Sequence, residues 1–325
     1  MDAKIINFMG VRKLALAFSA LLLIIAIGSM AVNGLKLGLD FTGGSLVEVN
    51  YEQDADTKLI RSQLVDAGFK DVVVQTFGSP KDILIRLQAD HDPKLGNKVL
   101  AVLESEADQA IELRRNEFVG AQVGDELREQ GGLGMLLALF MIMVYVTFRF
   151  QLKFSVGAVV ALVHDVIIVL GFFALFKLEF DLTVLAAILA VIGYSLNDTI
   201  VVSDRIRENF RKLRKETPIE VMNVSLSQTL SRTIVTSLTT LLVLVILAIF
   251  GGQMIFGFAI ALLVGVVVGT YSSIYVAANA LILMGVTKED LIIPPKQEHE
   301  FVEGEGFETD GYDGEEEEPE TETKP

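Results

Sequence analysis

The stretch LALAFSALLLIIAIGSMAVNG, residues 14–34, carries no charged side chain. It is as long as the run of about 20 apolar residues that a helix needs to cross a bilayer. The run exceeds the apolar core of about 7–15 residues found in signal peptides, and no small-x-small cleavage site follows it. We therefore predict an uncleaved transmembrane helix at 14–34 and a membrane protein.

The composition agrees with a protein that crosses the membrane several times. Hydrophobic residues make up 51% of the 325 residues, and the mean hydropathy of +0.50 is too high for an ordinary soluble protein. The chain has no cysteine, which excludes disulfides and thiolate metal sites. Five further candidate spans lie at 133–148, 154–176, 182–203, 233–250 and 254–284.

Basic residues gather on one side of these six candidate spans. They are Lys4, Arg12, Lys13, Arg149, Lys153, Arg205, Arg207, Arg211, Lys212, Arg214 and Lys215, whereas the opposite short loops hold only Lys177. The positive-inside rule places the basic side in the cytoplasm. We therefore predict a cytoplasmic N-terminus at 1–13, a basic cytoplasmic loop at 204–228 and a cytoplasmic C-terminus. Membrane lipid surrounds such a chain, and we expect no nucleic-acid partner.

The segment 35–132, between the first two spans, has the pattern of a small α+β domain on the outer face. Alternating apolar and polar residues predict strands, apolar residues at helical spacing predict helices, and turn residues separate them. The resulting order βαββαβ is that of the ferredoxin-like motif. The strands are expected at 45–51, 71–77, 82–88 and 116–124, and the helices at 56–68 and 94–114. No catalytic or metal-ligand cluster is visible in it, so we expect binding or docking and no enzymatic activity, cofactor or metal.

The last segment, 286–325, is predicted to be an acidic, disordered, cytoplasmic tail. Residues 298–325 hold thirteen Asp/Glu and one Lys, and so account for most of the net charge of −15. Few aliphatic residues and high charge are typical of disordered segments. The tail is either a solvating extension or a ligand for a basic cytoplasmic or ribosomal surface.

The candidate span 182–203 carries a polar stripe. Helical spacing places Asn197 and Asp198 on one face, with Asp198 about 7–8 Å inside the predicted cytoplasmic end. A charge at the bilayer centre costs about 2.5–3.5 kcal/mol on insertion scales, so such residues face protein or water and suggest an ion pathway. The alternative is a carboxylate near the interface that reaches water. Asp204 and Arg205 fit that second description better.

The span 154–176 contains His164 and Asp165, with Gly157 and Ala161 on the same face. Small residues permit close helix approach, which would bury the polar pair against a neighbouring helix. The pair is a candidate for ion transfer. Alternatively, His164 is a hydrogen-bonding group without a titration role.

The span 233–250 is preceded and entered by a second polar stripe: Thr229, Arg232, Thr233, Thr236, Ser237 and Thr240. Arg232 and Asp198 should lie at similar depths and could pair. An arginine that moves toward or away from a buried carboxylate changes whether that carboxylate binds a proton. Snorkelling of Arg232 to the interface is the alternative.

The span 254–284 repeats small residues at every fourth position, namely Gly257, Ala261, Gly265 and Gly269. Such a ridge is typical of close helix packing in membranes. We assign these residues to packing and not to ion transfer.

Three longer segments resemble a known family: GLDFTGGS (38–45), AVIGYSLNDTIVVSDRIRENFR (190–211) and SLSQTLSRTIVTSLTTLL (225–242). They are similar to the SecF family, one half of the bacterial SecD–SecF translocation accessory complex. The resemblance extends to about residue 290. The motif residues of the first segment are Gly38, Asp40, Phe41, Gly43 and Gly44. Ser203 stands where many relatives carry an aromatic residue.

The resemblance implies a half-unit of the resistance–nodulation–division superfamily in the bacterial inner membrane, with six spans and a periplasmic domain. It implies SecD as the other half, and the SecYEG translocon, YajC and SecA-driven preproteins as further partners. Family members use the proton motive force or another ion gradient in late translocation and release. By similarity, Asp198 and Arg232 belong to the ion relay, and a second essential carboxylate belongs to SecD.

Two other functions remain open at this point. The chain could be half of a small-molecule or lipid exporter on the same scaffold, or a passive scaffold of a membrane complex. A domain of roughly a hundred residues offers little room for the nested subdomains of such exporters. The coupling ion could be H⁺ or Na⁺.

Overall fold

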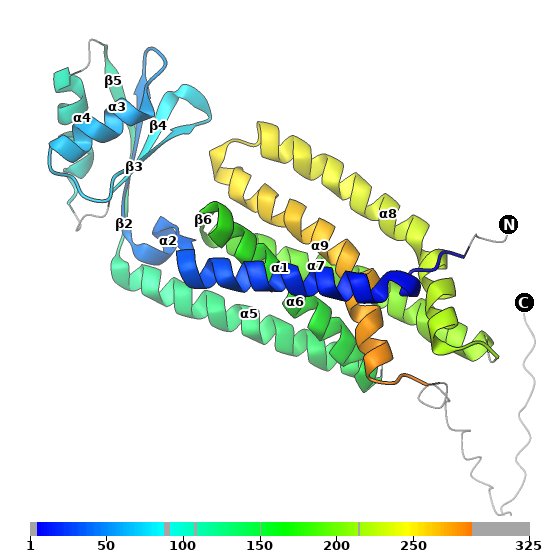
Figure 1. The fold of residues 1–325 in the computed structure, drawn as a ribbon. Helices are drawn as coiled ribbons and strands as arrows, with labels where there is room; N and C mark the ends of the chain where they lie inside the picture. Colours follow the sequence, from blue (N-terminus) through cyan, green and yellow to red (C-terminus); the bar gives the residue numbers. More distant parts are fainter. Residues whose placement is uncertain (1–4, 88–91, 107–108, 150, 214, 288–325) are drawn as a thin grey trace, which may run out of the picture. The chain divides into compact units, whose positions relative to one another are not determined.

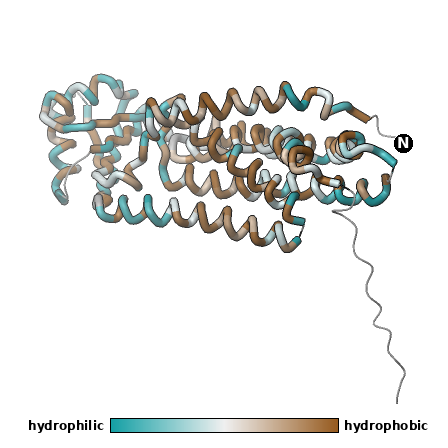
Figure 2. The backbone as a smooth tube through the Cα atoms, turned by 60° about the horizontal axis from the view of Figure 1, so that its bottom comes forward, coloured by the Kyte–Doolittle hydropathy of each residue, from teal (hydrophilic) through white to brown (hydrophobic). Residues whose placement is uncertain are grey.

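The computed structural model describes residues 5–87, 92–106, 109–149, 151–213 and 215–287. Six helices in this part are long and apolar enough to cross a membrane. They are α1 (Arg12–Asn33), α5 (Ala121–Arg149), α6 (Leu152–Phe176), α7 (Leu182–Lys212), α8 (Pro218–Phe250) and α9 (Gln253–Leu283). Figure 1 shows them running side by side, and in Figure 2 their middle parts are hydrophobic. The prediction of a helical polytopic membrane protein is confirmed.

The α+β domain is built from β2 (Gly44–Tyr51), α3 (Thr57–Asp66), β3 (Val73–Phe77), β4 (Ser79–Leu87), α4 (Leu95–Glu106) and β5 (Ile111–Val119). All strand pairs in its sheet are antiparallel, in the order β3-β4-β2-β5. A βαββαβ chain gives this order when it forms a ferredoxin-like sheet. Val47, Ile83 and Ile85 of the sheet pack with Leu64 and Val99 of the helices.

The last elements of the domain differ from the sequence prediction. We expected a helix at 94–114, but α4 ends at Glu106 and Ile111–Val119 is a strand. The segment pairs with β2 along its whole length, with a bulge at Glu48/Val49, and this pairing outweighs its helical periodicity. The predicted strand at 116–124 is therefore displaced toward the N-terminus. α5 then begins at Ala121, well before the apolar run at 133, because a helix can continue through the polar residues that flank a span.

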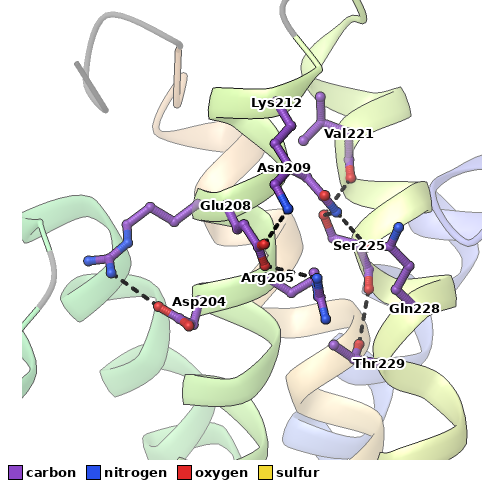
Figure 3. Close-up of polar contacts among 10 residues, drawn as sticks. Asp204, Arg205, Glu208, Asn209, Lys212, Val221, Ser225, Gln228 and Thr229 are labelled. Atoms are coloured by element: carbon purple, nitrogen blue, oxygen red, sulfur yellow. Dashed lines mark hydrogen bonds and ion pairs between the residues drawn. The ribbon is translucent and has the colours of Figure 1, made fainter. Parts of the chain in front are cut away.

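The expected loop at 204–228 is mostly helical. α7 continues to Lys212, and α8 begins at Pro218. Thr217 caps α8 in a capping box with Glu220, which is a strong helix start signal next to a proline at the first position. Figure 3 shows how the two helices are joined: Asn209 Nδ2 donates to Ser225 Oγ and to Gln228 Oε1, each at 2.9 Å.

The N-terminal residues pack against this same helical hairpin. Phe8 and Met9 are buried in a cluster with Phe210 and Met222, and Met9 N donates to Asn223 Oδ1 at 2.9 Å. In Figure 1 this end of the helices lies away from the α+β domain. The predicted acidic tail lies, from residue 288 on, outside the described residues.

Candidate ion site between the transmembrane helices

Two carboxylates lie buried among the transmembrane helices. Asp165 on α6 is 0% exposed, and Asp198 on α7 is 4% exposed. A carboxylate in such surroundings needs hydrogen bonds or a counter-charge, because burial removes its hydration. The two residues meet this need in different ways.

Asp165 is fully engaged by hydrogen bonds from three helices. Its Oδ2 accepts from Ser195 Oγ of α7 at 2.6 Å and from Ser272 Oγ of α9 at 2.7 Å. Its Oδ1 lies 2.9 Å from Nδ1 of His164. Hydrogen bonds to a charged acceptor are among the stronger polar contacts. Asp165 therefore ties α6 to both α7 and α9.

His164 extends this cluster toward α1. Its ring stacks on Tyr271, with centroids 6.4 Å apart, and the Tyr271 hydroxyl donates to the Ala15 carbonyl at 2.6 Å. His164 Nε2 is buried and has no hydrogen-bond partner in the described part of the chain. Among the described side chains, none satisfies the hydrogen-bonding capacity of this nitrogen.

Replacing Asp165 should destabilise the bundle. Asp165→Ala leaves the Ser195 hydroxyl and His164 Nδ1 buried without their partner, at a cost of about 1–3 kcal/mol for each unpaired group. Ser272 keeps the Gly269 carbonyl as an acceptor. We expect a lower melting temperature for the purified protein in detergent, measured by the loss of helical signal. Asp204→Ala on the exposed end of α7 is the control and should melt like the unmodified protein. Equal melting of the two variants would contradict this role.

At Asp198, in contrast, hydrogen-bonding atoms are left without partners. Its Oδ2 is buried without a hydrogen-bond partner among the described residues, and the same holds for Oγ1 of Thr199 and Oγ1 of Thr233. Thr199 and Thr233 are each 1% exposed. Buried polar atoms without partners are uncommon in proteins, and each needs an explanation.

A contact one helical turn away indicates that Asp198 and Thr233 lie at the same level of α7 and α8. These helices are antiparallel neighbours, with Tyr194 OH donating to Ser237 Oγ at 3.2 Å. Asp198 lies four residues after Tyr194 on α7, and Thr233 lies four residues before Ser237 on α8. Because the two helices are antiparallel, both steps cover about one turn in the same direction. Asp198 and Thr233 therefore lie on facing sides of α7 and α8. Thr199 lies four residues after Ser195 and so shares the face of α7 that Ser195 turns toward Asp165.

The oxygens of Asp198 and Thr233 limit the chemistry available to the site. A carboxylate facing a hydroxyl can hold a proton, a water molecule or, with further oxygen ligands, a hard cation such as Na⁺. Within the described ranges, no group of three or more His, Asp and Glu side chains could hold a metal ion.

Other predicted members of the relay lie differently from what we expected. Asn197 and Arg232 are exposed on the surface of the helices. Arg232 is near enough to act electrostatically on Asp198, but no ion pair joins the two among the residues that the structure describes. Thr236 Oγ1 donates to the carbonyls of Arg232 and Thr233 in its own helix, so this hydroxyl already has its partners.

The small-residue ridge of α9 faces α7. A Cβ added to Gly257, Gly265 or Gly269 would meet Val184, Val191 or Ser195, respectively, at 3.0, 2.1 and 3.0 Å, and Ala261 is 0% exposed. The ridge thus permits the close approach that lets Ser272, three residues after Gly269, reach Asp165. Gly157 of α6 would likewise place a Cβ 3.4 Å from the Ala277 carbonyl of α9.

Our sequence reasoning missed Ser195 and Tyr271 as members of the buried polar cluster. Ser195 lies one helical turn before Asp198, and Tyr271 follows the ridge of α9 directly. The signal that could have found them is this spacing from residues already identified. A serine inside a helix is nevertheless ambiguous, because it can bond to its own backbone.

The GLDFTGG motif holds the start of α7. The chain enters it through β1 (Lys36–Leu37), which pairs in parallel with β6 (Glu179–Phe180), and forms the short helix α2 (Leu39–Thr42). Asp40 Oδ2 accepts from Leu182 N at 3.0 Å, so the motif satisfies a free backbone donor at the N-terminus of α7. Phe41 is buried and stacks on Phe180.

The glycines of the motif lie at positions where a side chain would clash with neighbouring residues. A Cβ on Gly38 would lie 2.9 Å from Asp181 Cβ, and one on Gly44 would lie 2.7 Å from the Leu87 carbonyl oxygen. Gly43 and Gly44 also have φ angles of 70° and 131°, which side chains rarely adopt. The motif therefore allows a sharp, close connection between α1, α7 and strand β2.

Comparisons with known proteins agree with these features. Residues 99–287 match the family profile described as protein export membrane protein SecD/SecF, C-terminal, and residues 28–55 match the SecD/SecF GG motif. The chain is 57% identical over 290 residues to protein translocase subunit SecF of Pseudomonas aeruginosa, covering 89% of this chain and 94% of the relative. It is 49% identical over 303 residues to that of Vibrio alginolyticus, covering 92% and 96%.

The structure is similar to solved structures as well. The crystal structure of SecDF, a translocon-associated membrane protein from Thermus thermophilus, superposes with a TM-score of 0.77 at 38% identity. The match covers 86% of this chain but only 38% of the solved chain. SecDF in its super-membrane-facing form gives a TM-score of 0.66 with the same coverage. The chain thus spans just over a third of the SecDF chains that it resembles.

Proposed function

The chain belongs to the SecD/SecF family of protein export membrane proteins, and on this premise we propose that it couples an ion gradient to late export. As an accessory subunit of Sec protein export, it would use the proton motive force or a sodium gradient to help release preproteins on the periplasmic side. The role is mechanical coupling and not catalysis of a covalent reaction.

The observation that carries this proposal is the buried, unpartnered carboxylate oxygen of Asp198, together with two unpartnered hydroxyls on α7 and α8. Asp198 Oδ2, Thr199 Oγ1 and Thr233 Oγ1 are buried without hydrogen-bond partners in the described part of the chain. A passive scaffold gains nothing from such a costly arrangement, whereas an ion carrier needs a site that is satisfied only when the ion is bound.

The exposed polar residues support a second half that completes the relay. Asn197 and Arg232 are exposed on two of the helices that are apolar enough to cross a membrane, and polar groups within a span call for a protein partner. The solved SecDF chain is more than twice as long as the match. We propose that a SecD subunit covers this surface and supplies further charged groups of the relay.

The proposed topology follows from the basic residues and the six spans. Both termini and the α7–α8 hairpin would be cytoplasmic, the segment 35–132 would be periplasmic, and the membrane would be the bacterial inner membrane. The SecYEG translocon, YajC and SecA-driven preproteins would be the further partners. The acidic segment 286–325 would extend into the cytoplasm.

The proposal is tested by measuring release of an exported protein from spheroplasts that depend on this chain. We expect release to fall to the level of depleted cells when a protonophore collapses the proton gradient, or when sodium is removed if Na⁺ is the coupling ion. ATP is held constant, so that SecA-driven pushing continues. If release depends on the chain but is unchanged when either gradient is removed, the chain would be a passive scaffold.

A further inference from the structure

One cation connects the α+β domain to the start of α7. Arg86 lies on β4, and its Nη1 forms an ion pair with Glu179 Oε1 of β6 in the connection between α6 and α7. Both side chains are only 20% exposed. An ion pair shielded from water to this extent is screened less than one on the open surface.

Two further carboxylates act on Arg86, and both cap α7. Asp40 Oδ2 accepts from Leu182 N, and Asp181 Oδ1 accepts from Val184 N at 2.9 Å. Burial lowers the pKa of Arg86, whereas the negative charges of Asp181 and Asp40 act to raise it. The guanidinium therefore faces the three carboxylates that surround the N-terminus of α7.

The chain connections between the domain and the helices are short and contain glycine. The link from α2 into β2 passes through Gly43 and Gly44, both with positive φ, and the link from β5 into α5 passes through Gly120. A cleft of about 580 Å³, lined in part by Arg86, Glu179 and Lys177, separates the sheet from the ends of the helices. The ion pair between Arg86 and Glu179 lies beside this cleft and so links the sheet to the start of α7 in addition to the chain connections.

We propose that Arg86 is a positioning residue that transmits movement of α7 to the α+β domain. Asp198 lies sixteen residues after Leu182 on the same helix, about 24 Å along a rod of 1.5 Å rise per residue. A shift or tilt of α7 at the ion site reaches the capping carboxylates at its N-terminus. Arg86 follows these carboxylates and moves the sheet with them. This inference rests on the proposed ion coupling and adds its mechanical link.

The test measures the orientation of the α+β domain relative to the transmembrane helices in the whole complex. The chain has no cysteine, so Val65→Cys on α3 and Phe250→Cys at the end of α8, both exposed, can be labelled specifically. The complex with its partner half is reconstituted into liposomes, and the distance between two spin labels is measured with and without an ion gradient. We expect the gradient to shift this distance in the protein with Arg86 intact.

Arg86→Gln and Glu179→Gln should each lose most of the gradient-induced shift, whereas Arg86→Lys, which keeps the charge, should retain most of it. Arg115→Gln is the matched control, because Arg115 pairs with Glu117 on the same sheet and is 44% exposed. A full shift in both Arg86→Gln and Glu179→Gln overturns the inference. Loss of the shift in Arg115→Gln also overturns it, because the effect then belongs to the sheet in general. No shift with Arg86 intact would instead count against the proposed ion coupling.

Discussion

Asp198→Asn is expected to abolish gradient-dependent release of exported protein while the variant still inserts and assembles with its partner half. The amide has nearly the shape of the carboxylate but can neither take up a proton nor carry a charge to hold a cation. Removing a buried charge that lacks a partner should leave stability unchanged or raise it. Loss of function with retained assembly therefore identifies an ion site and not a structural contact.

The measurement compares release with and without the gradient, and membrane levels of both subunits serve as the assembly check. Asp204→Asn is the matched control, because Asp204 lies on the same helix, is exposed and pairs with Arg207. It should keep normal release. Undiminished gradient-dependent release by Asp198→Asn would falsify the ion-relay role and leave the chain as a scaffold.

The helical framework was predictable because membrane spans depend on apolar length alone. The six spans follow from runs of about 20 apolar residues, which no soluble arrangement explains. Their ends were not predictable in the same way. α7 and α8 extend beyond their apolar runs as a hairpin held by Asn209 and Ser225, and such an extension depends on packing between helices, not on hydropathy.

The candidate site was predictable only in part. The cost of burying charge pointed to Asp165 and Asp198 without any structure. Helical periodicity placed Asn197 beside Asp198 on one stripe, but it cannot say where the buried part of a stripe ends. The structure places that edge between them, with Asp198 buried and Asn197 exposed. The difference depends on which helices pack against α7.

The GLDFTGG motif shows the same limit. The amino-acid sequence of the motif revealed its resemblance to a family, but it did not reveal the physical role of the motif. Asp40 caps α7 across 142 positions of sequence, a contact that no local pattern predicts. The consequence is that the motif belongs mechanically to the helix that carries Asp198, and not only to the domain that follows it.

Gly171→Ala is expected to give the largest loss of stability of any single-methyl change in the described helices. A Cβ at Gly171 of α6 would lie 2.2 Å from Ala26 Cβ and 2.4 Å from Ala26 Cα of α1. The obstacle is a backbone atom, so α1 and α6 must move apart. Overpacking of this kind typically costs about 1–3 kcal/mol and sometimes more, and separation of the helices would also loosen contacts along their length.

The matched control is Gly28→Ala on α1, where an added Cβ meets nothing within 4 Å. There the change should be neutral or stabilise the helix by up to about 1 kcal/mol, because alanine favours helix more than glycine does. Thermal melting of the two purified variants in detergent separates the effects. Because both substitutions add one methyl group to a helical glycine, a difference in melting temperature reports only on the approach of α1 to α6. Equal melting temperatures would mean that the two helices can separate without cost, and that their contact at Gly171 does not hold the bundle together.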